Sequence, residues 1–289
     1  MNDKLSEKYI DLYDHYVHSP EPRREFLKKL AKAAGGTVAA AALLPWLEGT
    51  GAEAAMVAPG DGRLTTGMES FAGTGQGMKA YVVRPKGSGK LPAVVVIHEN
   101  RGLTPHIRDV ARRMALEGFL AVAPDIMAPI GGTPSDPDKA RDKIYDVSKA
   151  DVIKNLVGTA AFAKNHKHST GKVGAVGFCW GGQRVNLLAI NYADLSAAVA
   201  YYGRQPKKGV EKINAALLLH YAENDRGVNR GIDRYVKALK GAGKTFELHK
   251  YPGTRHAFNN DARPARYNEA AAKLAWKRTV AHFKKHLGS

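Results

Sequence analysis

The stretch that decides the fold is Gly177-Phe178-Cys179-Trp180-Gly181-Gly182. It follows an apolar run, residues 172–178, that predicts a strand, and it precedes a helical pattern over residues 182–190. The spacing Gly-x-Cys-x-Gly matches the nucleophile elbow, a sharp strand-to-helix turn, with cysteine in the usual serine position. The start of a helix favours a thiolate, so Cys179 is the predicted nucleophile. The alternative is a small cysteine buried in a glycine-rich turn.

On both sides of this turn, short apolar runs alternate with amphipathic stretches. Residues 93–97 read Ala-Val-Val-Val-Ile, a continuous run typical of a strand covered on both faces. Repeated strand–helix units predict an α/β fold with a mostly parallel central sheet and helices on both faces. The predicted strands are residues 79–83, 93–97, 119–123, 172–178, 197–201, 215–220 and 245–251, and the predicted helices are residues 104–116, 147–162, 182–190, 231–240 and 265–287.

A nucleophile needs a base, and the base needs a partner that fixes its tautomer. In a parallel sheet such residues gather beyond the carboxyl ends of the strands. Asp225 follows the strand that ends at residue 220, and His256 follows the strand that ends at residue 251. The order Cys, Asp, His is that of an α/β-hydrolase triad. Glu223, two residues from Asp225, is the rival for the acidic position.

With these residues in view, the sequence resembles the dienelactone hydrolase family, the carboxymethylenebutenolidase-like α/β-hydrolases. The resemblance covers about residues 68–288 and implies the α/β-hydrolase fold. It also implies an enzyme that cleaves an ester or lactone through a Cys-His-Asp triad and a thioester acyl-enzyme, with no metal and no cofactor. The matching pieces are Ile97-His-Glu-Asn-Arg-Gly102, Ala123-Pro-Asp125, Gly177-Phe-Cys-Trp-Gly-Gly182, Tyr201-Tyr-Gly203, and Tyr251-Pro-Gly253 through His256-Ala-Phe258.

The resemblance implies a role for Glu99: the matching glutamate of the family contacts the resting thiol and takes its proton when substrate arrives. The alternative is a structural carboxylate paired with Arg101 or another arginine. The backbone N–H groups of Trp180 and Asn100, which follow the nucleophile and Glu99, are the predicted oxyanion hole.

Two substitutions separate this chain from the lactone-cleaving members. Those members grip the substrate carboxylate with two arginines, and Pro129 and Asn260 stand at the matching positions here. The candidate substrate-binding residues are instead Arg101, Tyr202 and Arg204. We expect the substrate to be a small ester or lactone, and an arginine would bind it best if it carries a negative charge. The alternatives are solvated arginines and ordinary packing of the tyrosine.

Composition limits the other functional classes. The net charge is +17 and the isoelectric point is about 9.8, which brings nucleic-acid binding into question. The basic residues form no cluster and no nucleic-acid motif occurs, so steering of anionic substrates is the better explanation. One cysteine permits no internal disulfide and no zinc site built from cysteines. The alternative functions are a basic binding protein without catalysis and a thioesterase or other acyl hydrolase.

The first 54 residues differ from the rest. Arg23 and Arg24, followed by Phe-Leu-Lys and an apolar run over residues 33–47, resemble a twin-arginine export signal. That run is too short for a stable membrane anchor, and Ala52-Glu-Ala54 resembles a cleavage site. We therefore expect a periplasmic protein with a signal over residues 1–54, a linker over 55–77 and the hydrolase domain over 78–289. The alternative is a retained helical arm on a cytoplasmic protein.

Overall fold

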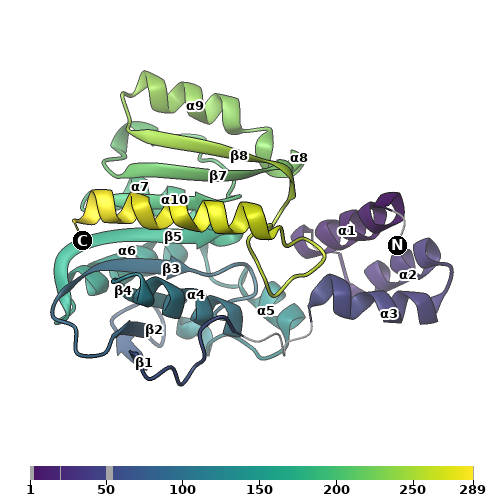
Figure 1. Ribbon diagram of the computed structural model, residues 1–289, viewed down its shortest axis with the longest axis horizontal. Helices are drawn as coiled ribbons and strands as arrows, with labels where there is room; N and C mark the ends of the chain where they lie inside the picture. The colour runs from purple at the N-terminus through teal and green to yellow at the C-terminus, as the bar shows by residue number, and fades with distance from the viewer. Residues whose placement is uncertain (1–2, 20, 50–54, 289) are drawn as a thin grey trace.

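A single eight-stranded sheet forms the centre of the computed structural model, which describes residues 3–19, 21–49 and 55–288 (Figure 1). The strand order is β1-β2-β4-β3-β5-β6-β7-β8. The β1–β2 and β2–β4 pairs are antiparallel and every other pair is parallel. The strands are β1 (Leu64–Phe71), β2 (Met78–Pro85), β3 (Leu91–Ile97), β4 (Leu120–Asp125), β5 (Ser169–Phe178), β6 (Ala197–Tyr201), β7 (Ala216–Asn224) and β8 (Phe246–Arg255). This is the predicted α/β-hydrolase arrangement.

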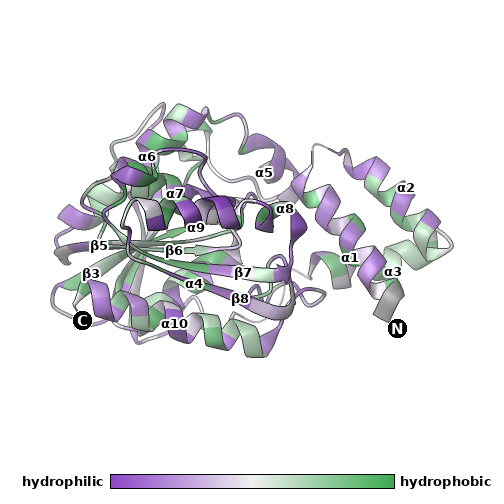
Figure 2. Ribbon diagram, turned by 90° about the horizontal axis from the view of Figure 1, so that it is seen from above, coloured by the Kyte–Doolittle hydropathy of each residue, from purple (hydrophilic) through white to green (hydrophobic). Residues whose placement is uncertain are grey.

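Helices cover both faces of the sheet, with α6, α7 and α9 on one face and α4 and α10 on the other (Figure 2). Alternate residues of β3 explain the two layers: Val95 packs with the first group of helices and Val94 with the second. The helices are α4 (Pro105–Leu116), α5 (Pro137–Lys143), α6 (Lys149–Asn165), α7 (Trp180–Asn191), α8 (Arg226–Asn229), α9 (Ile232–Gly241) and α10 (Glu269–Leu287), with short 3₁₀ turns η1 (Ala128–Ile130) and η2 (Val210–Lys212).

Three further helices, α1 (Asp3–His18), α2 (Arg23–Ala34) and α3 (Thr37–Glu48), lie together beyond the carboxyl ends of the parallel strands (Figure 1). They have a small core of their own. Tyr13 and Tyr16 of α1 are fully buried, and the Tyr16 ring stacks on Phe26 of α2 at a centroid distance of 4.5 Å. The tyrosines recur every three or four residues, which places them on one face of α1.

The sequence prediction of a linker over residues 55–77 is corrected by the structure. Residues 64–71 form β1, an edge strand paired with β2, and Val57 is buried. The strand was missed because most of its residues are exposed, so it lacks an apolar run or a clear alternation. The proposed cleavage site at residues 52–54 lies outside the described residues.

Within the described ranges, no single helix has the length and hydropathy of a membrane span. The pair α2 and α3 reaches that hydropathy together, and the two helices are bent by 112° at their junction.

Candidate active site

Cys179 stands at the junction of β5 and α7, in the strained geometry of a nucleophile elbow. Its φ is 55°, a left-handed value that is uncommon outside glycine. The turn fits because Gly177 and Gly181 lack side chains: a Cβ at Gly177 would lie 2.4 Å from the carbonyl oxygen of Gly181, and a Cβ at Gly181 would lie 2.4 Å from that of His98. The elbow therefore presents the Cys179 side chain above the carboxyl edge of the sheet.

His256 and Asp225 meet at the same edge, after β8 and β7. Nδ1 of His256 donates to Oδ2 of Asp225 at 2.5 Å, which leaves Nε2 without a proton in the neutral ring. Burial lowers the pKa of His256, but the nearby Cys179 and Asp225 raise it, and the result lies well above the ordinary value. Glu223 accepts instead from the backbone N–H of Gly253 at 2.8 Å. The geometry thus favours Asp225 over Glu223 as the partner of His256.

Backbone strain is concentrated around this site. Among the described residues, the non-glycine residues with positive φ are Cys179, Tyr202 and Ala257. Two of them flank or form the Cys179–His256 pair, and the Tyr202 ring packs 4.8 Å from the His256 ring between centroids. Clustering of strained backbone is a mark of functional sites.

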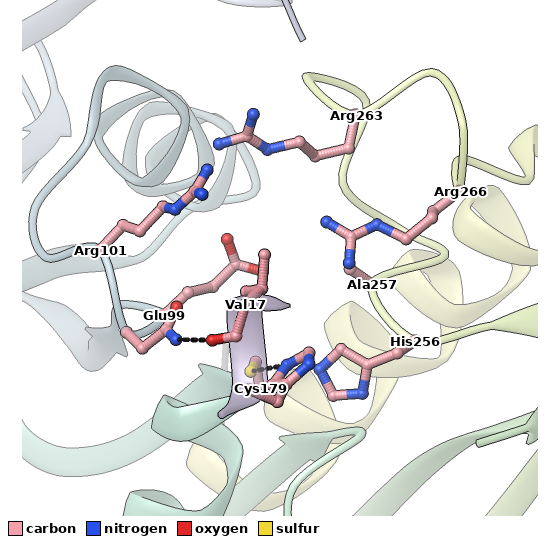
Figure 3. Close-up of a pocket in the computed structure, with 10 residues that line it drawn as sticks. Val17, Glu99, Arg101, Cys179, His256, Ala257, Arg263 and Arg266 are labelled. Carbon is pink, nitrogen blue, oxygen red and sulfur yellow. Dashed lines mark hydrogen bonds between the residues drawn. The ribbon is translucent and has the colours of Figure 1, made fainter. Parts of the chain in front are cut away.

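A small pocket opens beside Cys179 and His256, with arginines at its other end (Figure 3). Arg101, Arg263 and Arg266 all line it. Arg101 lies 3.6 Å from Asp138, and Arg266 is paired with Asp14 of α1. Sequence analysis named only Arg101. The other two lie in the loop between β8 and α10, and nothing in their local sequence distinguishes them from surface arginines.

Glu99 lines the same pocket, between Cys179 and the arginines (Figure 3). Its Oε2 accepts a hydrogen bond from Nδ2 of Asn260 at 3.0 Å. Asn260, one of the two positions where the family resemblance implied an arginine, therefore orients the carboxylate of Glu99. The pairing of Glu99 with Arg101 that the sequence left open does not occur, because Arg101 pairs with Asp138.

The remaining predicted residues divide into two groups. Asn100 lines the pocket, whereas Trp180 follows Cys179 in the chain but is not among the lining residues, and its ring stacks on His98 at 5.6 Å. Tyr202 is fully buried beneath His256, where its hydroxyl bonds Asn259. Arg204 is exposed and is absent from the pocket lining, so it is not brought to the site.

The C-terminal end of α1 covers the site. Nδ2 of Asn100 donates to the carbonyl oxygen of Val17 at 3.0 Å, and Arg266 pairs with Asp14. Arg255 pairs with Asp11 at 2.6 Å. With α1 in place, the cavity has a volume of about 20 Å³, the room that one water molecule needs.

His18, the last residue of α1, contacts the predicted nucleophile. Its Nε2 lies 3.4 Å from Sγ of Cys179, and its ring lies edge-on to the His256 ring at 4.5 Å. His18 keeps an exposed face, but the loss of water on the side that meets the site and the neighbouring His256 lower the pKa of His18 to about 3. His18 is therefore neutral at pH 7 in this arrangement. Sequence analysis missed it, because 161 residues separate it from Cys179.

The comparisons with known proteins agree with this architecture. Residues 78–287 match the model of the dienelactone hydrolase family. A Salmonella typhi protein named "Putative carboxymethylenebutenolidase" is 35% identical over 250 residues, which cover 81% of this chain and 92% of that protein.

Two solved structures extend the comparison. The crystal structure titled "Putative Dienelactone Hydrolase" from Klebsiella pneumoniae has 34% identity and a TM-score of 0.69, and the match covers 77% of this chain and 99% of that one. A mutant of the esterase rPPE, 17% identical, matches in fold over 99% of this chain and 98% of its own with a TM-score of 0.68.

A family match over most of the chain, a relative above 30% identity and the mostly parallel sheet lead to one conclusion. This chain belongs to the dienelactone hydrolase family, a family of carboxylic ester and lactone hydrolases with the α/β-hydrolase fold.

Proposed function

We propose that this protein hydrolyses a carboxylic ester or lactone with Cys179 as nucleophile, His256 as base and Asp225 as the residue that orients the base. The observation that carries the proposal is the convergence of the strained elbow with the Asp225–His256 pair at one edge of the sheet. Three side chains from three separate turns meet there, as a triad requires.

The proposed reaction has two halves. The Cys179 thiol passes its proton to Glu99, and the thiolate attacks the ester carbonyl while the backbone N–H groups of Trp180 and Asn100 hold the negative oxygen. His256, whose raised pKa keeps it protonated on both nitrogens at this point, gives its Nε2 proton to the leaving alkoxide. The neutral His256 then takes a proton from water as the water attacks the thioester, so that the acid leaves and the released Cys179 thiolate recovers its proton from Glu99. The position of Trp180 in the first turn of α7 supports its part, because N–H groups there lack helical partners.

Glu99 is the proposed acceptor of the thiol proton before attack. Its place in the pocket and the hydrogen bond from Asn260 support this role, since both fix a carboxylate near the sulfur. A thiol that stays neutral until substrate arrives is also protected from oxidation.

We propose that the acyl part of the substrate carries a carboxylate or another anionic group. Support comes from Arg101, Arg263 and Arg266, which line the end of the pocket away from Cys179. Guanidinium groups bind carboxylates through paired hydrogen bonds. These arginines occupy different sequence positions from the two that the lactone-cleaving members use.

The proposed hydrolysis requires α1 to leave the site, because a cavity of about 20 Å³ admits no ester. We propose that residues 1–54 hold the site closed and that their displacement or removal opens it. The proposal includes export through the twin-arginine signal formed by Arg23 and Arg24. In the closed form Arg24 is exposed, whereas Arg23 pairs with Glu48 and Asp138. A periplasmic protein that loses this segment after export would become active at its destination, and a cytoplasmic protein with a retained arm is the alternative.

The experiment that tests the proposed function is a hydrolysis screen on the protein freed of residues 1–54. It compares neutral aryl esters, lactones, thioesters and carboxylate-bearing esters, each with the Cys179→Ala variant as the matched control. Hydrolysis that disappears in Cys179→Ala supports the proposal. Equal hydrolysis by both proteins contradicts it, and preferred cleavage of thioesters would favour the thioesterase alternative.

A further inference from the structure

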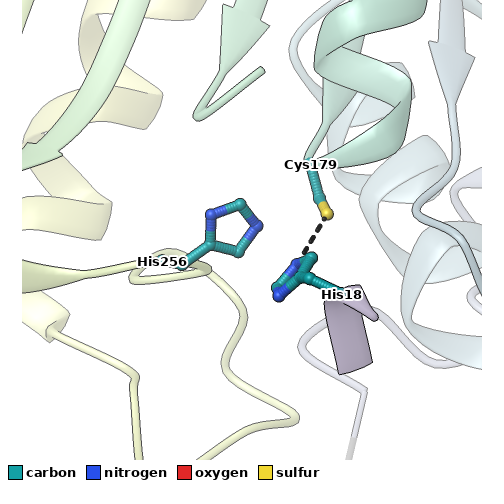
Figure 4. Close-up of side chains that lie close together, drawn as sticks. All are labelled: His18, Cys179 and His256. Carbon is teal, nitrogen blue, oxygen red and sulfur yellow. Dashed lines mark hydrogen bonds between the residues drawn. The ribbon is translucent and has the colours of Figure 1, made fainter. Parts of the chain in front are cut away.

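Three potential metal ligands meet where α1 reaches the elbow. Nε2 of His18, Sγ of Cys179 and a ring nitrogen of His256 all lie within 4.8 Å of one another (Figure 4). They come from the end of α1, the start of α7 and the turn after β8. The set is therefore complete only when α1 covers the site.

The tautomers of both histidines are fixed by their other nitrogens. Nδ1 of His18 lies 2.8 Å from the carbonyl oxygen of Asp14, and Nδ1 of His256 lies 2.5 Å from Asp225. Both partners only accept, so both Nδ1 atoms carry a proton, and Nε2 is the atom of each ring that is available to a metal. Metal-binding histidines are held in this way, with the second ring nitrogen donating to a carboxylate or a backbone carbonyl.

The two Nε2 atoms have few partners in the protein. Nε2 of His18 lies 3.4 Å from the Cys179 sulfur. Nε2 of His256 is buried and has no hydrogen-bond partner within the described part of the chain. A cation placed among the three atoms would satisfy both nitrogens and the sulfur at once.

We propose that His18, Cys179 and His256 bind one divalent cation of the zinc type when α1 is docked. Two imidazoles and a thiolate are ligands that zinc favours, and three protein ligands leave a fourth position for water. The adjoining cavity of about 20 Å³ has room for that water. Coordination breaks the S–H bond of Cys179 and the Nε2–H bond of the protonated His256, forms metal–sulfur and metal–nitrogen bonds, and releases both protons to solvent.

The distances require only small movements. Zinc bonds of about 2.0–2.1 Å to nitrogen and 2.3 Å to sulfur in a tetrahedron separate the ligand atoms by roughly 3.3–3.6 Å. The His18–Cys179 pair is already at 3.4 Å, and the widest pair, at most 4.8 Å, has to close by about 1 Å.

Two carboxylates offset part of the positive charge around the three ligands. Asp225 lies behind His256, and Glu99 lines the same pocket. Of the neighbouring arginines, Arg266 is paired with Asp14 and Arg101 with Asp138, whereas Arg263 lines the pocket without an ion pair to any described residue.

A cation bound here would occupy both the nucleophile and the base and fasten α1 over them. The metal site uses Cys179 and His256 of the proposed triad, so this proposal rests partly on the same geometry as the proposed function. It does not require that the protein hydrolyse any ester, and binding can be measured without substrate.

The test uses the full chain, stripped of metal with a chelator, and Co²⁺ followed by Zn²⁺ as probes. We expect one equivalent of Co²⁺ to give a thiolate-to-cobalt charge-transfer band with the visible bands of tetrahedral cobalt, and Zn²⁺ to displace it. Cys179→Ala should lose the charge-transfer band. His18→Gln, which keeps the size of the side chain, should bind at least tenfold more weakly, since even loss of a supporting partner costs 10–100-fold.

His15→Ala is the matched control, because His15 lies on α1 but its side chain is 62% exposed and does not reach the site. It should bind like the wild type, and a melting curve should show each variant folded. Wild-type binding without a thiolate band, or with the affinity of His18→Gln, would overturn the proposal and point to histidines elsewhere, such as the neighbouring His282 and His286 of α10. Failure of the proposed function would be a different result: an enzyme freed of residues 1–54 and of metal that cleaves no ester.

Discussion

The His18 Nε2 atom lies 3.4 Å from the Cys179 sulfur, so the last residue of α1 contacts the predicted nucleophile directly. The same helix fills the space in front of the sulfur and is fastened by ion pairs from Arg255 and Arg266. The structure therefore describes a closed form of the active site, and the N-terminal helices become part of any account of activity.

Release of α1 should activate the enzyme. A protease site introduced at residues 50–54 allows removal of the first 54 residues from the folded protein. We expect kcat/KM for a small aryl ester to rise at least tenfold on cleavage, which corresponds to α1 being docked in about nine-tenths or more of the molecules. Asp14→Asn, which weakens the pair with Arg266, should raise the activity of the uncut chain in part.

The control for Asp14→Asn is His15→Ala, on the same helix and directed to solvent. We expect the remaining domain to fold alone. The match with the Klebsiella pneumoniae structure covers 99% of that chain but 77% of this one, so that protein folds without an equivalent of the rest of this chain. Equal activity before and after cleavage would contradict the closed-site interpretation.

Glu99→Gln separates two roles of the same residue. The glutamine keeps the shape and can still accept from Asn260, but it cannot take the thiol proton. In the protein freed of residues 1–54, turnover should fall by about 10²–10⁴-fold, the usual effect of a positioned proton acceptor, with the melting temperature little changed. Turnover, melting temperature and iodoacetamide kinetics are measured on the same variant. A lowered melting temperature with unchanged turnover would make Glu99 structural.

Arg263 should select for negative charge on the substrate. Arg263→Met should lower kcat/KM for a carboxylate-bearing ester by about 10–100-fold, because a charge-assisted hydrogen bond contributes about 1.5–3 kcal/mol. Hydrolysis of a neutral ester of equal size should change little. Arg204→Met is the control, since Arg204 is exposed and outside the pocket. Equal losses on both esters would remove Arg263 from substrate recognition.

Export is tested by replacing Arg23 and Arg24 with lysine. The twin-arginine machinery recognises the arginine pair as an address, so the double variant should stay in the cytoplasm as a folded, uncleaved protein. Cell fractionation with immunoblotting measures this, and each single variant serves as a control. An uncleaved cytoplasmic wild type would support the retained arm instead.

Much of the fold and the triad candidates could be predicted because their signals are local. The buried strands are continuous apolar runs, and parallel strands bring Cys179, Asp225 and His256 to one edge regardless of their distance in sequence. The sequence favoured Asp225 and left Glu223 as its rival, and the structure separates the two because Asp225 accepts from His256 whereas Glu223 accepts from the backbone of Gly253.

What the sequence did not predict depends on contacts with no local pattern. β1 is an exposed edge strand without a regular apolar alternation. The position of His18 follows from how α1 packs against distant loops, and Arg263 and Arg266 reach the pocket through the turn after β8. At residue 260 the family resemblance implied an arginine, whereas the structure shows that the side-chain amide of Asn260 donates a hydrogen bond to Glu99.

The central claim, that Cys179 carries the acyl group, can be tested by trapping the intermediate. The protein freed of residues 1–54 is mixed with an aryl ester, quenched in acid within the first turnover, and analysed by intact mass and peptide mapping. The account predicts one acyl group on Cys179, none on Cys179→Ala, and much less on the uncut chain. An acyl group on another residue, or ester hydrolysis that persists in Cys179→Ala, would contradict it.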